Sequence, residues 1–166
     1  TALSLPGQHN QLNAIAAIAA ARHAGVPVNV SLDALRRFKG IKRRMELRGE
    51  VNAIKVYDDF AHHPTAIQLT LDGLRKNVSK KRIIAILEPR SNTMKMGVHK
   101  ETLANSLSLA DFVYLYQADN LGWDLATEFK NKDSVQVYSS TQAIIDKVME
   151  EVKEDDHIVI MSNGGF

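Results

Sequence analysis

The strongest constraint on the fold is an alternation of short apolar runs with longer helical patterns from residue 51 onward. The apolar runs predict strands at 51–57, 82–87, 112–116 and 157–161, with a weaker strand at 134–138. Apolar residues at helical spacing predict helices from Pro64 to Val78, around Leu103 to Ala110, and over 140–153. Strands that alternate with helices of this length predict right-handed crossovers, hence an α/β fold with a mainly parallel sheet and helices on both faces.

The first 40 residues follow a different pattern. Residues 10–24 predict a helix that Asn10 caps and that Gly25 and Pro27 end, and a short second helix is expected from Ser31 to Phe38. The first helix is apolar nearly all round, so we expect it to pack against a larger structure. We therefore divide the chain into an appendage, residues 1–28, and an α/β domain, residues 29–166. Thr1 is not an initiator Met and the chain stops after Gly165 and Phe166, so both ends are expected to be cuts within a longer protein.

Composition excludes several classes of protein. The chain has no Cys, which removes disulfides, thiolate zinc sites and a Cys nucleophile. A formal net charge of +2 is too small to indicate a nucleic-acid partner. The basic cluster at 39–48 contains Glu46 and is followed by Glu50, so it is not a purely basic segment. No apolar run approaches the roughly 20 residues that span a bilayer, so no membrane partner is expected.

Three polar loops follow predicted strands, at 58–63, 88–96 and 162–165. Ligands of parallel sheets bind outside the carboxyl ends of the strands, so these loops indicate a site. The first loop holds Asp58, Asp59, His62 and His63, which suit a metal ion, a nucleotide, or merely the cap of the helix that begins at Pro64. In the second loop, Arg90 and Lys95 suit substrate carboxylates, and Ser91, Asn92 and Thr93 can supply hydrogen bonds.

Two further segments have both a functional and a structural interpretation. Asn10 and Asn13 are spaced to project on one side of a helix, where amides match the edge of adenine, although a simple N-cap is the commoner explanation. Arg43 and Arg44 suit phosphates, although a solvated basic edge is more usual. The sequence has no Gly-x-x-x-x-Gly-Lys-Ser/Thr phosphate loop, so complete nucleotide hydrolysis within this chain is not expected.

Taken together, these segments resemble the Mur ligase family. The resemblance lies in Gly-x-His-Asn-x-x-Asn before an Ala-rich helix at 7–13, Phe-x-Gly-x-x-Arg-Arg-x-Glu at 38–46, and Asp-Asp-Phe-Ala-His-His-Pro-Thr at 58–65. It implies that residues 1–28 are the helical tail of a central ATPase domain. It further implies that residues 29–166 are most of a Rossmann-like C-terminal domain, truncated at its end. The third motif resembles the branch whose first substrate is UDP-N-acetylmuramate.

The resemblance also implies an activity. The loop at 88–97 and the ending Ser-Asn-Gly-Gly-Phe resemble the members that join UDP-N-acetylmuramate to the tripeptide L-Ala-γ-D-Glu-meso-diaminopimelate in peptidoglycan recycling. That reaction uses ATP and Mg²⁺, forms an acyl phosphate, and takes place in the bacterial cytoplasm. The phosphate loop, the magnesium-binding acid and a modified lysine belong to the missing central domain. The fragment is therefore expected to be inactive alone, with no catalytic residue and no metal ligand, and to pack on the missing central domain.

Residue by residue, the resemblance assigns roles to two groups. The nucleotide contacts would be Asn10 and Asn13 at adenine, Arg44 at the phosphates, Asp59 at the ribose and His62 beside them. The contacts with the peptide substrate would be His63, Arg90, Ser91 and Asn92. The alternatives are a UDP-N-acetylmuramate–L-alanine ligase, a metal-dependent hydrolase that uses the Asp/His cluster, and a non-catalytic binding module.

Overall fold

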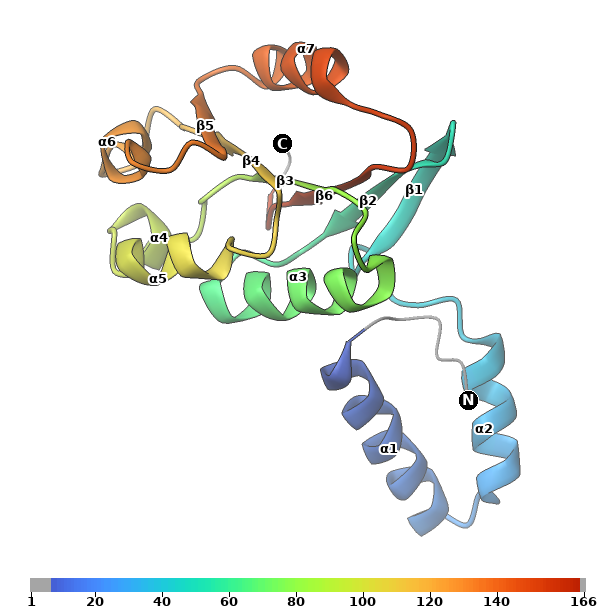
Figure 1. Ribbon diagram of the computed structural model, residues 1–166. Coiled ribbons are helices and arrows are strands. Elements are labelled where there is room, and N and C mark those ends of the chain that lie inside the picture. The colour runs from blue at the N-terminus through green and yellow to red at the C-terminus, as the bar shows by residue number, and fades with distance from the viewer. Residues whose placement is uncertain (1–6, 165–166) are drawn as a thin grey trace.

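The computed structural model describes residues 7–164 and consists of a helical hairpin followed by an α/β domain (Figure 1). The hairpin comprises α1 (Gln8–His23) and α2 (Val28–Arg37). The strands of the domain are β1 (Glu46–Val51), β2 (Ile54–Asp59), β3 (Ile83–Leu87), β4 (Phe112–Tyr116), β5 (Val135–Tyr138) and β6 (His157–Met161). Its helices are α3 (Pro64–Val78), α4 (Asn92–Lys95), α5 (Lys100–Ser106), α6 (Leu125–Phe129) and α7 (Thr141–Glu151).

The strands form one sheet in the order β1-β2-β6-β3-β4-β5. Only β1 runs antiparallel to its neighbour, and all other neighbouring pairs are parallel. Figure 1 shows α7 on one face of the sheet and α3, α4 and α5 on the other. The mainly parallel α/β fold predicted from the alternation of apolar runs is therefore confirmed.

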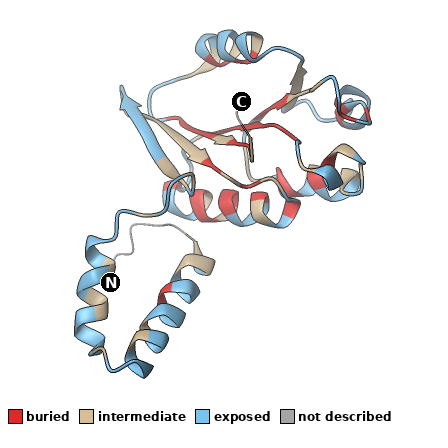
Figure 2. Cartoon of the chain, turned by 180° about the vertical axis from the view of Figure 1, so that it is seen from behind, coloured by how far each residue is buried: buried red, intermediate tan, exposed pale blue. Residues whose placement is uncertain are grey.

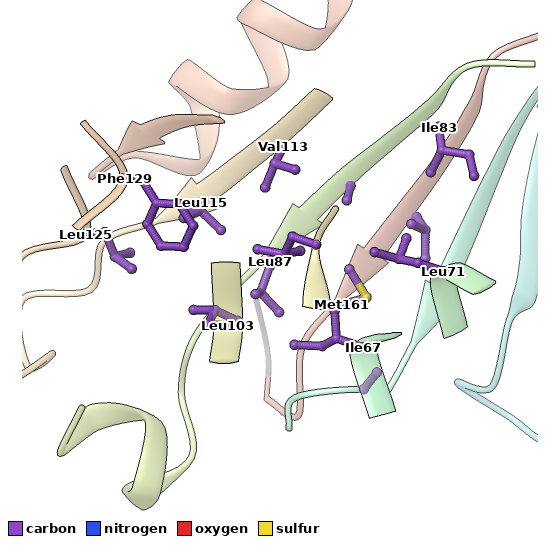
Figure 3. Packing of buried hydrophobic residues seen from close by; sticks show 14 of the residues in the cluster. Ile67, Leu71, Ile83, Leu87, Leu103, Val113, Leu115, Leu125, Phe129 and Met161 are labelled. Carbon is purple, nitrogen blue, oxygen red and sulfur yellow. The ribbon is translucent and has the colours of Figure 1, made fainter. Parts of the chain in front are cut away.

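Two apolar cores lie on the two faces of the sheet. The larger core packs Ile67 and Leu71 of α3 and Leu103 of α5 against β3, β4 and β6 (Figure 3). The smaller core packs Ile144 and Val148 of α7 against the other face. β3 is buried on both faces along its whole length, as its uninterrupted apolar sequence indicates. The sheet is thus fixed from both sides, and the carboxyl ends of its strands are held in constant positions.

The prediction of one strand at 51–57 is wrong at its start, because the strand there begins at Ile54. Val51 ends β1, and Asn52 and Ala53 form a two-residue turn with φ of 50° and 59° before β2 begins. Such turns favour Asn-Gly, and Ala in the second place hides the signal. The charged residues of β1, which is the exposed edge of the sheet, hide its strand character in the same way.

The short helices α4 and α6 were not predicted, because four and five residues cannot show a helical period. The start of α2 lies three residues before the predicted Ser31, since Pro27 occupies its N-cap. Asn10 does not cap α1, because the helix begins at Gln8 with Gly7 as its N-cap.

The hairpin of α1 and α2 extends away from the sheet (Figures 1 and 2). Ala14 is the one residue of α1 that is buried among those described, while Leu12 and Ile15 are largely exposed. Within residues 7–164 the expected larger partner of this helix is therefore not found. The proposed boundary at 28/29 falls directly after the first residue of α2 and stays a prediction. Residues 1–6 and 165–166 lie outside the described part.

Candidate functional site

The three polar loops meet at one edge of the sheet because β2, β6 and β3 are neighbours. The backbone N–H of Ser162 donates to the carbonyl of Asp59 at 3.2 Å, and that of Glu88 donates to the carbonyl of Met161 at 3.1 Å. The Arg43 guanidinium adds hydrogen bonds to the carbonyls of Ser162 at 2.6 Å and Gly164 at 3.1 Å. The prediction that these loops share one edge is confirmed for their described residues.

A cavity of about 360 Å³ lies beside this edge, between the start of α1 and the α/β domain. Four of the nine predicted site residues line it: Asn10 and Asn13 of α1, Arg44 of the segment before β1, and Asp59 at the end of β2. The remaining lining residues are His9, Ile41, Met45 and Thr70. Side chains that are up to 61 positions apart in the chain thus face one polar cavity, of the size that binds small ligands.

Asp59 is the buried carboxylate of this cavity and is only 3% exposed. Its Oδ1 accepts hydrogen bonds from the backbone N–H of Ala61 at 2.8 Å and from the Thr70 hydroxyl at 3.3 Å, and its Oδ2 accepts one from Met45 N–H at 2.8 Å. Burial raises the pKa of the Asp59 carboxyl above its ordinary value, although these hydrogen bonds and the Arg44 charge oppose the shift. Because Oδ2 accepts a single bond within the described part, it can accept another from a ligand.

Arg44 stands between this cavity and a second one of about 370 Å³, which Lys39, Lys42 and Glu46 also line. Its guanidinium carbon lies 5.6 Å from the centre of the Phe60 ring, a cation–π distance, and that of Arg43 lies 5.3 Å from the same ring. The side chain of Arg44 thus lies where the Asp59 cavity adjoins a hollow whose charged side chains are mainly cationic.

The two histidines after β2 do not line the cavity. His63 is the N-cap of α3, and its Nδ1 accepts a hydrogen bond from Thr65 N–H at 3.3 Å. This confirms the capping interpretation for His63. The Nδ1 of His62 lies 2.9 Å from the carbonyl of Phe60, so in the neutral ring this nitrogen carries the proton and Nε2 is left as an acceptor.

Arg90, Ser91 and Asn92, which the resemblance assigns to the peptide substrate, lie together after β3. The Ser91 hydroxyl caps α4 by accepting from Met94 N–H at 3.4 Å, and Asn92 is the exposed first residue of that helix. The Trp123 indole N–H donates to the carbonyl of Met94 at 2.6 Å and fixes α4 from the next loop. These three residues do not line the cavity of Asp59, so the structure separates the predicted site residues into two groups.

Several residues of this edge were not predicted. Arg43 was considered only as part of a basic segment, yet its side chain contacts both Asp58 and the loop after β6. His9 and Thr70 line the cavity, and Glu88 and Ser162 form a buried hydrogen bond of 2.6 Å. A polar residue directly after a buried strand was the available signal for Glu88 and Ser162. No sequence signal marks Thr70, because it lies inside a regular helix.

The geometry does not support the metal-dependent hydrolase. Asp58 and Asp59 are adjacent in a strand and point to opposite faces. Asp58 approaches Arg43 at 3.5 Å, whereas Asp59 turns to Thr70. Among residues 7–164 no three Asp, Glu or His side chains come together as a metal site. The same residues include no helix that is long and apolar enough to cross a membrane.

The chain is similar to known proteins of one family. Residues 43–164 match the family described as Mur ligase, glutamate ligase domain. The chain is 50% identical to the UDP-N-acetylmuramate–L-alanyl-γ-D-glutamyl-meso-2,6-diaminoheptandioate ligase of Escherichia coli, over 98% of its own length and 36% of that enzyme. It is 33% identical to the UDP-N-acetylmuramate–L-alanine ligase of Bdellovibrio bacteriovorus, over 98% of the chain and 37% of the enzyme.

Among solved structures, a murein peptide ligase from Psychrobacter arcticus is 52% identical, with a TM-score of 0.72. The match covers 96% of this chain and 35% of that one. The chain thus spans about a third of the length of the proteins it matches.

Proposed function

Because the chain belongs to the Mur ligase family, we propose that it is part of an ATP-dependent ligase that joins UDP-N-acetylmuramate to the tripeptide L-Ala-γ-D-Glu-meso-diaminopimelate. The observation that carries the proposal is the cavity onto which Asn10, Asn13, Arg44 and Asp59 converge. In the full-length ligase this cavity would hold the nucleoside of ATP. The reaction would serve peptidoglycan recycling in the bacterial cytoplasm.

The lining residues fit a nucleoside chemically. Carboxamides of Asn10 and Asn13 can both donate to and accept from the edge of adenine, and Oδ2 of Asp59 can accept from a ribose hydroxyl. Arg44 lies at the border with the cationic hollow, where it would bind phosphate oxygens, and His62 would lie close to the nucleotide. We place the Mg²⁺ ligands in the central domain of the ligase, together with the phosphate loop.

ATP would supply the phosphoryl group that activates the lactyl carboxylate of the muramate as an acyl phosphate. The amine of the tripeptide alanine then attacks the acyl carbon, and the tetrahedral intermediate expels phosphate. The residues of this chain would bind and orient the reactants, and the Arg44 charge would stabilise negative charge on phosphoryl oxygens. The chain without the central domain is expected to release no phosphate from ATP.

The second group of residues would bind the peptide. Arg90 would pair with a peptide carboxylate, Ser91 and Asn92 would supply hydrogen bonds, and His63 would lie at the edge of the same substrate. The higher identity to a tripeptide-adding enzyme, 50% against 33% for an L-alanine-adding one, favours the tripeptide as the substrate.

The proposal is tested by ligation with the full-length protein, supplied with ATP, Mg²⁺ and UDP-N-acetylmuramate. We expect ADP formation that depends on the tripeptide and is far slower with free L-alanine. Faster turnover with L-alanine would favour the alternative ligase. Hydrolysis that needs a transition metal and is lost in His62→Ala would favour the hydrolase.

A further inference from the structure

Glu88 is a buried carboxylate at the ligand-binding edge that the proposed function does not use. It follows β3 directly and is 6% exposed. Burial of a carboxylate is costly unless charged or hydrogen-bonding partners compensate it, so its partners indicate its role. Oε2 accepts a hydrogen bond from the Ser162 hydroxyl at 2.6 Å, and Oε1 lies 3.7 Å from the Arg90 guanidinium.

The two other buried carboxylates of the described residues, Asp59 and Asp156, are held by partners that stabilise the fold, and Asp59 already has a place in the proposed function. Asp59 binds backbone N–H groups of two loops. Asp156 pairs with Arg82 at 2.5 Å and accepts from Lys153 N–H, at the amino end of the sheet. Glu88 differs because it faces a side chain that lies at the ligand-binding edge and remains about half exposed.

The surroundings of Arg90 restrict where its guanidinium can lie. A Cβ added at Gly164 would overlap the guanidinium of Arg90, so this guanidinium packs directly on the bare backbone of Gly164. Gly164 N–H in turn donates to the Ser162 hydroxyl at 3.0 Å, the same hydroxyl that donates to Glu88. Glu88, Ser162 and Gly164 therefore form one hydrogen-bonded unit that lies against the Arg90 guanidinium.

We propose that Glu88 is a positioning residue that holds the Arg90 guanidinium in the orientation that binds a carboxylate of the peptide substrate. The inference rests on the proposed function, since it takes Arg90 as a contact of the peptide. A long Arg side chain loses conformational freedom when it binds a ligand, and a buried carboxylate that orients it in advance lowers that cost. Glu88 itself would not touch the substrate.

The test is a double-mutant cycle in the full-length ligase, with KM for tripeptide, KM for ATP and the melting temperature measured for each variant. The variants are Glu88→Gln, Arg90→Ala and the pair. Glu88→Gln keeps the shape of the side chain and an acceptor for Ser162 but removes the charge that faces Arg90. The matched control is Asp156→Asn, which neutralises an equally buried, Arg-paired carboxylate at the opposite edge of the sheet.

We expect Glu88→Gln and Arg90→Ala each to raise the KM for tripeptide about tenfold, as loss of a charge-assisted contact implies, with the KM for ATP unchanged. Glu88→Gln should add little in the Arg90→Ala background. Asp156→Asn should lower the melting temperature without changing the KM for tripeptide.

If Glu88→Gln raised the KM for tripeptide equally in the presence of Arg90 and in the Arg90→Ala background, the positioning role would be overturned. The proposed function would remain intact. An unchanged KM for tripeptide in Arg90→Ala would remove the proposed peptide contact, and the inference with it. A parallel rise in the KM for ATP would show a general structural effect and would also overturn the inference.

Discussion

Asp59 serves the fold and the proposed site with the same carboxylate. Its bonds to Ala61 and Met45 fix the two segments that flank the cavity, so a substitution there would disturb folding and binding together. Asn13 is the better test of binding, because it is exposed and lines the cavity. We expect Asn13→Ala to raise the KM for ATP in the full-length ligase about tenfold, the effect of losing one or two hydrogen bonds.

The control for this prediction is Gln11→Ala. Gln11 is exposed on the same helix and does not line the cavity. The KM of the Gln11→Ala variant for ATP should therefore stay unchanged. Equal effects of the two substitutions would contradict the placement of adenine beside Asn13.

His157 predicts a pH dependence of stability. Burial, together with the charges of Lys55 and Lys81, lowers the pKa of its ring below the ordinary 6.5. Between the lowered pKa and 6.5 the unfolded chain binds more protons than the folded protein, so the free energy of unfolding falls as the pH decreases through that range. His157→Gln, which can still bond the Tyr57 hydroxyl, should weaken this dependence. Urea unfolding between pH 5 and 8 measures the free energy of unfolding of both proteins. The same pH dependence in His157→Gln and in the unsubstituted protein would contradict the prediction.

At the scale of elements, the β1–β2 turn holds Ala53 at a φ of 59°, which costs a non-glycine residue about 1 kcal/mol. Ala53→Gly is therefore expected to raise the free energy of unfolding by about 0.5–1 kcal/mol, as urea unfolding measures. The control is Ala143→Gly within α7, which should lower the free energy of unfolding by about 1 kcal/mol because this alanine is helical. Destabilisation by Ala53→Gly would contradict the turn geometry.

Elements with a strong apolar pattern were predictable, and those fixed by tertiary contacts were not. The strands 112–116 and 157–161 have the predicted bounds because their buried positions, apart from His157, are apolar. β1 could not be predicted, because an exposed edge strand needs no apolar face. The edge that gathers the three loops follows from chain order and parallel pairing, whereas the Glu88–Ser162 contact depends on side-chain positions 74 residues apart.

For the whole molecule, the exposed apolar residues of α1 support packing on a central domain. Ile15 is 61% exposed in the described structure, and Met149 on α7 is 70% exposed. In the full-length ligase we expect Ile15→Asp to lower the free energy of unfolding by about 1–3 kcal/mol, because it would place a charge in an interface. Met149→Asp should change the free energy of unfolding little. Equal losses of stability in the two variants, as calorimetry measures them, would contradict the packing of α1 on a central domain.

The most direct test of the nucleotide site is a crystal structure of the full-length ligase with ADP. We expect the adenine within hydrogen-bonding distance of the Asn10 or Asn13 carboxamide, with a ribose hydroxyl at Asp59 Oδ2 and phosphate oxygens toward Arg44. A nucleoside bound elsewhere, with none of these side chains in contact, would contradict the central claim.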